Sequence, residues 1–239
     1  MTSTEEGAVV AASYLLLRKA IGIIGLLLPI GCLVGNAAFT SARLPGSLSY
    51  YYYTPMRNFF VGSLCLLGVF LLLHDVGVRA DRWISNVAGA SMLGVAFCPA
   101  APPPPHVTTT EDVVGNLHFV FAVIAFAALG VMTWRFGQAG SDGPGSPAPP
   151  RGATIFYRVC AGLLLGFAAI SGLANLLPGS VKGATLAVFD FEALSIITFG
   201  VSWFVKGIDV ESAVPASAAL IRGLRLGVRD PAAPGDIPP

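Results

Sequence analysis

The chain has 239 residues, of which 54% are hydrophobic and 11% are charged. Soluble domains carry about 25% charged residues, so this composition excludes an ordinary soluble domain and indicates an integral membrane protein. The formal net charge of +1 gives no reason to expect nucleic acid as a partner, and the predicted partner is the lipid bilayer.

Six stretches of the chain are apolar and long enough to cross a bilayer as helices. Such a helix needs about 20 mainly apolar residues to cross roughly 30 Å of hydrocarbon. The sequence therefore predicts an all-α, polytopic membrane bundle of six transmembrane helices, of which the third is the shortest. In chain order, the predicted spans cover residues at about 16–38, 57–77, 84–100, 114–134, 154–177 and 185–206.

Basic residues between the spans predict the orientation, because Lys and Arg that flank a span stay on the cytoplasmic side. Six spans place both ends of the chain on one face. That face carries eight basic residues close to the spans and the opposite face carries three, so both termini are predicted to be cytoplasmic. The eight are Arg18, Lys19, Arg79, Arg82, Arg135, Arg151, Arg158 and Lys206, and the three are Arg43, Arg57 and Lys182.

Two segments outside the spans have a distinct composition. GQAGSDGPGSPAPPRGA, residues 137–153, is rich in Gly, Pro and Ser and predicts a flexible cytoplasmic linker inside one transmembrane domain, 1–206. Residues 207–239 predict a cytoplasmic tail. In this tail ALIRGLRLGVR mixes apolar and basic residues, as suits the inner membrane surface, and DPAAPGDIPP predicts a disordered end.

The stretch SYYYYTPMR, residues 49–57, precedes the second span on the predicted outer side. Tyrosine suits the membrane boundary because its ring tolerates the acyl region while its hydroxyl stays hydrated. Two interpretations stay open: the tyrosines anchor the span, or they line a pocket that binds a lipid headgroup or another anionic group. The ligand-binding residues predicted here are Tyr51, Tyr52, Tyr53, Arg57 and Asn58.

Ionisable side chains inside the spans are costly unless they are paired or hydrated, so they mark function or packing. His118 lies about one turn inside the outer end of the fourth span, and Glu111 shares its helical face. Asp190 and Glu192 lie one to two turns inside the outer start of the sixth span and point in different directions. From Glu192, a polar stripe predicted to face other helices continues through Ser195, Ser202 and Lys206.

Three functions are compatible with this outer layer of polar side chains. The main prediction is a pocket that binds or moves a lipid or an amphipathic small molecule, with Arg57 and the tyrosines at its mouth and His118 and Glu192 deeper. Glu111 is also predicted to bind the ligand. The second is a membrane-embedded hydrolase or transferase that uses His118 and Glu192, or Asp190, in acid–base catalysis. In the third, a structural or accessory subunit, these groups pair with one another and fix helix packing. Whether the chain is a homo-oligomer or a subunit of a membrane complex stays open.

No cofactor and no metal are predicted. The motifs HExxH and HxxxH are absent from the sequence. The four cysteines form no CxxC pair and fall in different spans, so we expect them to pack as small apolar side chains.

Two inner segments and one glycine pair carry smaller predictions. HDVGVRADRWISN, residues 74–86, predicts salt bridges in a cytoplasmic turn, and SWFVKG, residues 202–207, predicts an aromatic anchor at the end of the sixth span. GLLLG, residues 162–166, has the spacing of small residues that favours a close helix contact.

Three segments, SLSYYYYTPMRNFFVGSLCLLGVFLLL, NVAGASMLGVAFCP and FEALSIITFGVSWFVKG, resemble an uncharacterised group of bacterial multi-pass membrane proteins. The resemblance covers most of the spans but neither the linker nor the tail. It implies a location in the bacterial cytoplasmic (inner) membrane and implies no activity. A more distant resemblance to DRAM/Sfk-type six-helix proteins implies lipid handling. The positions that match the group are Tyr51, Tyr52, Tyr53, Arg57, Asp81, Asn86, His118, Glu192, Ser202, Trp203 and Lys206.

Overall fold

The computed structural model describes residues 3–39, 44–75, 77–102, 107–176 and 185–213. All regular structure in these ranges is helical, which confirms the all-α prediction. The elements are α1 (Ser3–Phe39), the short 3-10 helix η1 (Leu48–Tyr53), α2 (Arg57–Leu73), α3 (Arg79–Phe97), α4 (Thr109–Arg135), α5 (Arg151–Leu176) and α6 (Thr185–Ala213).

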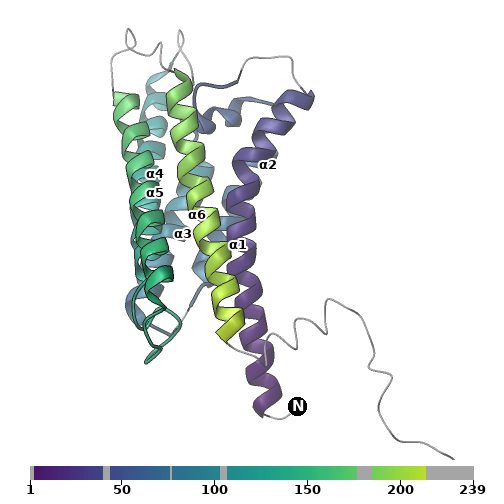
Figure 1. The fold of residues 1–239 in the computed structure, drawn as a ribbon. Helices are drawn as coiled ribbons and strands as arrows, with labels where there is room; N and C mark the ends of the chain where they lie inside the picture. Colours follow the sequence, from purple (N-terminus) through teal and green to yellow (C-terminus); the bar gives the residue numbers. More distant parts are fainter. Residues whose placement is uncertain (1–2, 40–43, 76, 103–106, 177–184, 214–239) are drawn as a thin grey trace, which may run out of the picture.

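The α-helices lie side by side and run alternately up and down (Figure 1). Each packs against the next helix in the chain, and α1 packs against α6, so the helices form a closed bundle. The start of α1 and the end of α6 lie at the same end of the bundle, which we call the terminal end (Figure 1). The opposite end carries η1, and we call it the η1 end.

Four of the helices are long and apolar enough to cross a membrane, namely α1, α4, α5 and α6. The other two fall short of this: α2 is an apolar helix of 17 residues, and α3 has 19 residues but begins with the charged residues Arg79, Asp81 and Arg82. The prediction of a multi-pass membrane protein therefore holds for four helices.

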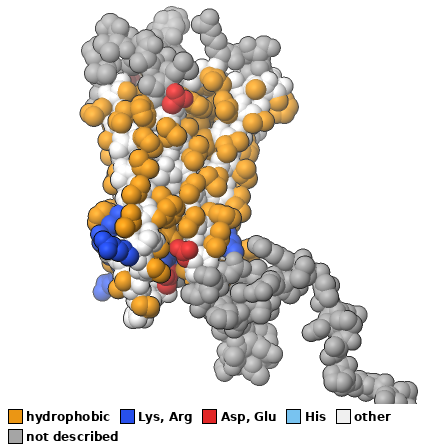
Figure 2. All heavy atoms as spheres, viewed as in Figure 1, with side chains coloured by type: hydrophobic (Ala, Val, Ile, Leu, Met, Phe, Trp, Pro, Cys, Tyr) orange, Lys and Arg blue, Asp and Glu red, His pale blue; other side chains and the backbone are white. Residues whose placement is uncertain are grey.

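The outer surface of the bundle is apolar along its length. Figure 2 shows apolar side chains covering the middle of the visible face, whereas Lys and Arg gather toward the terminal end. Large apolar side chains that face outward include Leu27, Leu66, Val123 and Leu163. A surface of this kind, with the backbone polar groups bonded inside helices, is what hydrocarbon requires.

Helices α1 and α6 make a close contact, where glycines face each other. A Cβ atom added at Gly22 would lie 2.5 Å from the backbone nitrogen of Phe204 and 2.8 Å from the carbonyl oxygen of Gly200. The glycines therefore allow the two backbones to approach. In the GLLLG stretch of α5, by contrast, a Cβ added at Gly162 or Gly166 meets nothing within 4 Å, so this stretch makes no such contact.

Candidate functional site

The tyrosine run begins with a serine-capped turn at the η1 end. Ser47 precedes η1, and its side chain accepts a hydrogen bond from the backbone N–H of Ser49 at 3.1 Å. Serine is a preferred residue at this position because its oxygen satisfies an N–H that has no partner within the helix. The turn fixes the directions of the side chains that follow it.

The tyrosines that were predicted to act together have different environments. Tyr51 is fully buried and packs against Phe189, and its hydroxyl has no hydrogen-bond partner among the described residues. Tyr52 lies under the guanidinium of Arg57, which is 4.2 Å from the ring centre and donates a hydrogen bond of 2.6 Å to the hydroxyl. Tyr53 is exposed and donates to the carbonyl oxygen of Ala100 at 2.7 Å.

Glu192 of α6 binds the residues that begin η1. One of its carboxylate oxygens accepts a hydrogen bond from the Ser47 hydroxyl and another from the Leu48 backbone N–H, each at 2.7 Å. This carboxylate therefore attaches the η1 turn to α6.

His118 of α4 binds the same turn from the other side. Its Nδ1 lies 2.6 Å from the carbonyl oxygen of Cys98, at the end of α3, and its Nε2 lies 2.9 Å from the hydroxyl oxygen of Ser49. A carbonyl oxygen can only accept, so Nδ1 carries the proton in the neutral imidazole, and Nε2 accepts from Ser49. His118 is buried, with 6% of its surface exposed.

Glu192 and His118 are therefore linked through the η1 turn: Ser47 donates to Glu192, the Ser49 backbone N–H donates to Ser47, and the Ser49 hydroxyl bonds to His118. These bonds, together with that of His118 to Cys98, join α6, η1, α4 and the end of α3. The sequence placed His118 and Glu192 at the same depth, and the structure connects them to one turn. The two serines were missed, although their spacing in GSLS just before the tyrosines is the available signal.

The other predicted site residues lie elsewhere. Glu111 is exposed and forms a capping box with Thr108 at the start of α4, accepting hydrogen bonds from its backbone N–H and its hydroxyl, each at 2.8 Å. Asp190 is exposed on α6, and Asn58 is exposed on α2. The polar stripe of α6 is buried as predicted, since Ser195, Ser202 and Lys206 are at most 1% exposed.

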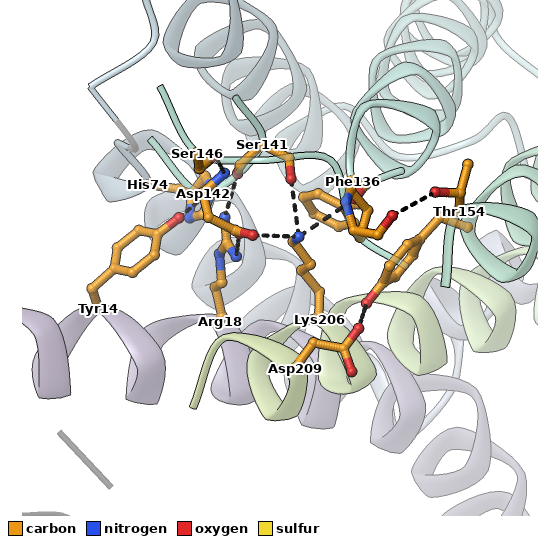
Figure 3. Close-up of polar contacts among 12 residues, drawn as sticks. Tyr14, Arg18, His74, Phe136, Ser141, Asp142, Ser146, Thr154, Lys206 and Asp209 are labelled. Atoms are coloured by element: carbon orange, nitrogen blue, oxygen red, sulfur yellow. Dashed lines mark hydrogen bonds and ion pairs between the residues drawn. The ribbon is translucent and has the colours of Figure 1, made fainter. Parts of the chain in front are cut away.

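The terminal end contains a second polar cluster (Figure 3). Arg18 of α1 and Lys206 of α6 are both buried, and Asp142 lies between them. The two oxygens of its carboxylate are 2.9 Å from Arg18 Nη1 and 2.8 Å from Lys206 Nζ. Lys206 also donates to the Ser141 hydroxyl at 3.0 Å, and Arg18 donates to the Ser141 carbonyl oxygen at 3.2 Å.

This cluster changes the interpretation of the segment 137–153. The sequence predicts a flexible linker, but Ser141 is buried and Asp142 bonds to two helices. Burial raises the pKa of the Asp142 carboxyl, but Lys206 and Arg18 lower it by more, so that its pKa lies below the ordinary value. The carboxylate is therefore held in its charged form between the two cations.

The terminal end is packed rather than hollow. A cavity of about 10 Å³, enough for one water molecule, lies beside Arg18, His74 and Ser141. Trp203 is fully buried against His74 and Phe136, so it is not the surface anchor that the sequence predicted. The predicted salt bridge in the α2–α3 turn is present between Asp75 and Arg82, both partly exposed.

The fold and the surface define a helical, multi-pass, membrane-embedded protein with polar clusters at both ends. Comparisons of the chain with protein-family models, with curated proteins and with solved structures find no match. Within the described ranges, no three His, Cys, Asp or Glu side chains gather where they could hold a metal ion.

Proposed function

We propose that the chain is a six-span protein of the bacterial cytoplasmic membrane, with both ends in the cytoplasm, and that its η1 end binds the anionic headgroup of a lipid or similar amphiphile. The alternating directions of the helices favour six crossings (Figure 1). At about 1.5 Å per residue, the 17 residues of α2 extend about 25 Å, close to the thickness of the hydrocarbon. Basic residues gather toward the terminal end, which favours its cytoplasmic location (Figure 2).

The observation that carries the lipid site is the pair of Arg57 and Tyr52. Arg57 is exposed and, among the described residues, forms no ion pair with a carboxylate. Its guanidinium lies on the Tyr52 ring, which orients it without neutralising its charge. Tyr53 and Phe59, close to it in the sequence, expose aromatic rings at the same end of the bundle. A fixed cation beside apolar surface suits a phosphate attached to acyl chains.

Lipid retention tests this site. Native mass spectrometry of the purified full chain, titrated with phosphatidylglycerol and separately with phosphatidylcholine, compares wild type with Arg57→Ala. We expect wild type to retain phosphatidylglycerol preferentially and Arg57→Ala to weaken that retention about tenfold, which corresponds to the loss of one charge-assisted contact.

Arg158→Ala is the matched control, because Arg158 also stacks on an aromatic ring, that of Trp134, at a centroid distance of 5.1 Å on the other half of the bundle. It is expected to change retention by less than about twofold. Equal losses in the two variants would show general attraction to basic residues and would overturn a site at Arg57.

A further inference from the structure

We propose that Ser49 is a nucleophile activated by His118, and that the η1 end carries an acyl-transfer site for carboxylic esters of membrane lipids. The activation of Ser49 stands on its own geometry. The choice of a lipid as the ester substrate rests on the proposed function. The composition of the chain does not point to Ser49.

The geometry is that of a nucleophile, its base and a group that orients the base. The Ser49 hydroxyl oxygen lies 2.9 Å from His118 Nε2, within the range for direct proton transfer. On the other side of the ring, Nδ1 donates to the Cys98 carbonyl oxygen at 2.6 Å. This donation leaves the lone pair of Nε2 directed at the hydroxyl, which is the tautomer that a general base requires.

Burial and tethering hold the three groups in place. His118 is 6% exposed, whereas Ser49 is only partly buried, so the base is shielded and the nucleophile remains accessible. The backbone N–H of Ser49 donates to Ser47, whose hydroxyl in turn donates to Glu192. Glu192 thus positions the turn that carries Ser49, and it does not contact the reacting atoms.

The surroundings favour an ester that is part of a lipid. Phe97 and Leu117 directly precede Cys98 and His118, and their side chains are 70% and 45% exposed. In a bilayer, apolar side chains exposed at the level of Cys98 and His118 would contact acyl chains. An ester linkage lies at the boundary between acyl chains and headgroups, and the proposed six crossings would place the turn with Ser49 at this boundary.

The reaction balances with these groups alone. The Ser49 oxygen forms a bond to the ester carbonyl carbon while its proton moves to His118 Nε2. The C–O bond to the alcohol then breaks, and His118 returns the proton to the departing oxygen. Water, or the hydroxyl of a second lipid, attacks the acyl-serine in the same way and releases a carboxylic acid or a new ester, with no oxidation or reduction.

A fluorophosphonate tests the activation of Ser49 without knowledge of the substrate. The serine oxygen displaces fluoride from phosphorus, and the adduct is located by peptide mass spectrometry of the full chain in nanodiscs. We expect one adduct, at Ser49, that forms on folded protein and not after heat denaturation. Ser47 serves as an internal control, since it donates to a carboxylate instead of an imidazole and should stay unlabelled.

His118→Asn is expected to slow labelling at least about 100-fold, the contribution of a general base. Its melting temperature is measured alongside, and His118→Gln is the second variant in case His118→Asn fails to fold. Folded wild type with no adduct at Ser49, or labelling that persists in a folded His118 variant, would overturn the proposal. If phosphatidylglycerol is retained but Ser49 is not labelled, only the activation of Ser49 by His118 (the Ser49–His118 dyad) is refuted. If Ser49 is labelled but the lipid is not retained, only the lipid site at Arg57 is refuted.

Discussion

Asp142→Ala is expected to lower the free energy of unfolding by about 2 kcal/mol, less than the roughly 3–5 kcal/mol cost of breaking a fully buried ion pair, because the Asp142 side chain is 31% exposed. The variant leaves the guanidinium of Arg18 and the ammonium of Lys206 buried without their shared carboxylate. Both cations are at most 1% exposed, so in the folded protein the carboxylate of Asp142, rather than water, balances their charge. Thermal unfolding of the purified protein in detergent, followed by tryptophan fluorescence, measures the loss.

Asp112→Ala is the matched control, because Asp112 is an exposed carboxylate in the first turn of α4, and its loss should cost less than about 1 kcal/mol. Replacing Arg18 and Lys206 with methionine in the Asp142→Ala background should restore most of the stability. An Asp142→Ala protein as stable as Asp112→Ala would contradict the stabilising role of the Arg18–Asp142–Lys206 cluster.

The lowered pKa of Asp142 also makes the stability depend on pH. The contribution of Asp142 to the free energy of unfolding is fully present above the ordinary Asp pKa of about 4, and it is lost as the pH falls through the lower pKa of the folded state.

Gly22→Ala is expected to destabilise the bundle by about 1–3 kcal/mol, the typical cost of overpacking. The added methyl group would meet backbone atoms of Gly200 and Phe204 at 2.5 to 2.8 Å, and backbone cannot move aside as a flexible side chain can. Helices α1 and α6 must therefore separate, which loosens the contact that closes the bundle. The melting temperature in detergent provides the measurement.

Gly162→Ala is the control for the glycine prediction. The methyl group added there meets nothing within 4 Å, and alanine is the better helix former by about 1 kcal/mol. Its melting temperature should be unchanged or higher. If Gly22→Ala melts at the same temperature as Gly162→Ala, the close approach of α1 and α6 is not needed for stability.

The helices follow from the sequence because apolar length is a direct physical requirement of the membrane. The residues at which the helices begin and end are predicted less accurately. The second span was predicted to continue to residue 77, but α2 ends at Leu73, and Gly77 adopts a φ of +74°, which favours glycine. The third was predicted from residue 84, but α3 begins at Arg79. Its first residues include the exposed Arg79 and Arg82 and the buried Asp81, whose charge is paired with Arg135 of α4.

The sequence predicts that His118 and Glu192 lie at the same depth in the membrane, but it does not predict their hydrogen bonds to Ser47 and Ser49. His118 and Glu192 are visible because ionisable groups stand out in apolar spans. Ser47 and Ser49 are not, because a hydroxyl barely changes local hydropathy. Successive tyrosines are indistinguishable in composition, whereas a 3-10 turn points them about 120° apart, so that Tyr51 is buried and Tyr53 is exposed.

The contacts of Asp142 could not be predicted from the sequence for a different reason. Its neighbours are Gly, Pro and Ser, which predict flexibility, but its partners are two cations far away in the chain. Arg18 is 124 residues before it and Lys206 is 64 residues after it. Local composition cannot report contacts of this range, and the burial of the cations is visible only in the fold.

The proposed six-span arrangement with cytoplasmic ends places the η1 end outside the cell, and single-cysteine labelling tests this orientation directly. The four native cysteines are replaced by alanine, and one cysteine is introduced at Tyr53 or at Ala139, exposed positions at the η1 end and in the loop after α4. A membrane-impermeant maleimide should label Tyr53→Cys on intact cells and Ala139→Cys only after permeabilisation. Labelling of Ala139→Cys on intact cells, with Tyr53→Cys protected, would contradict the proposed orientation, in which both ends of the chain are cytoplasmic.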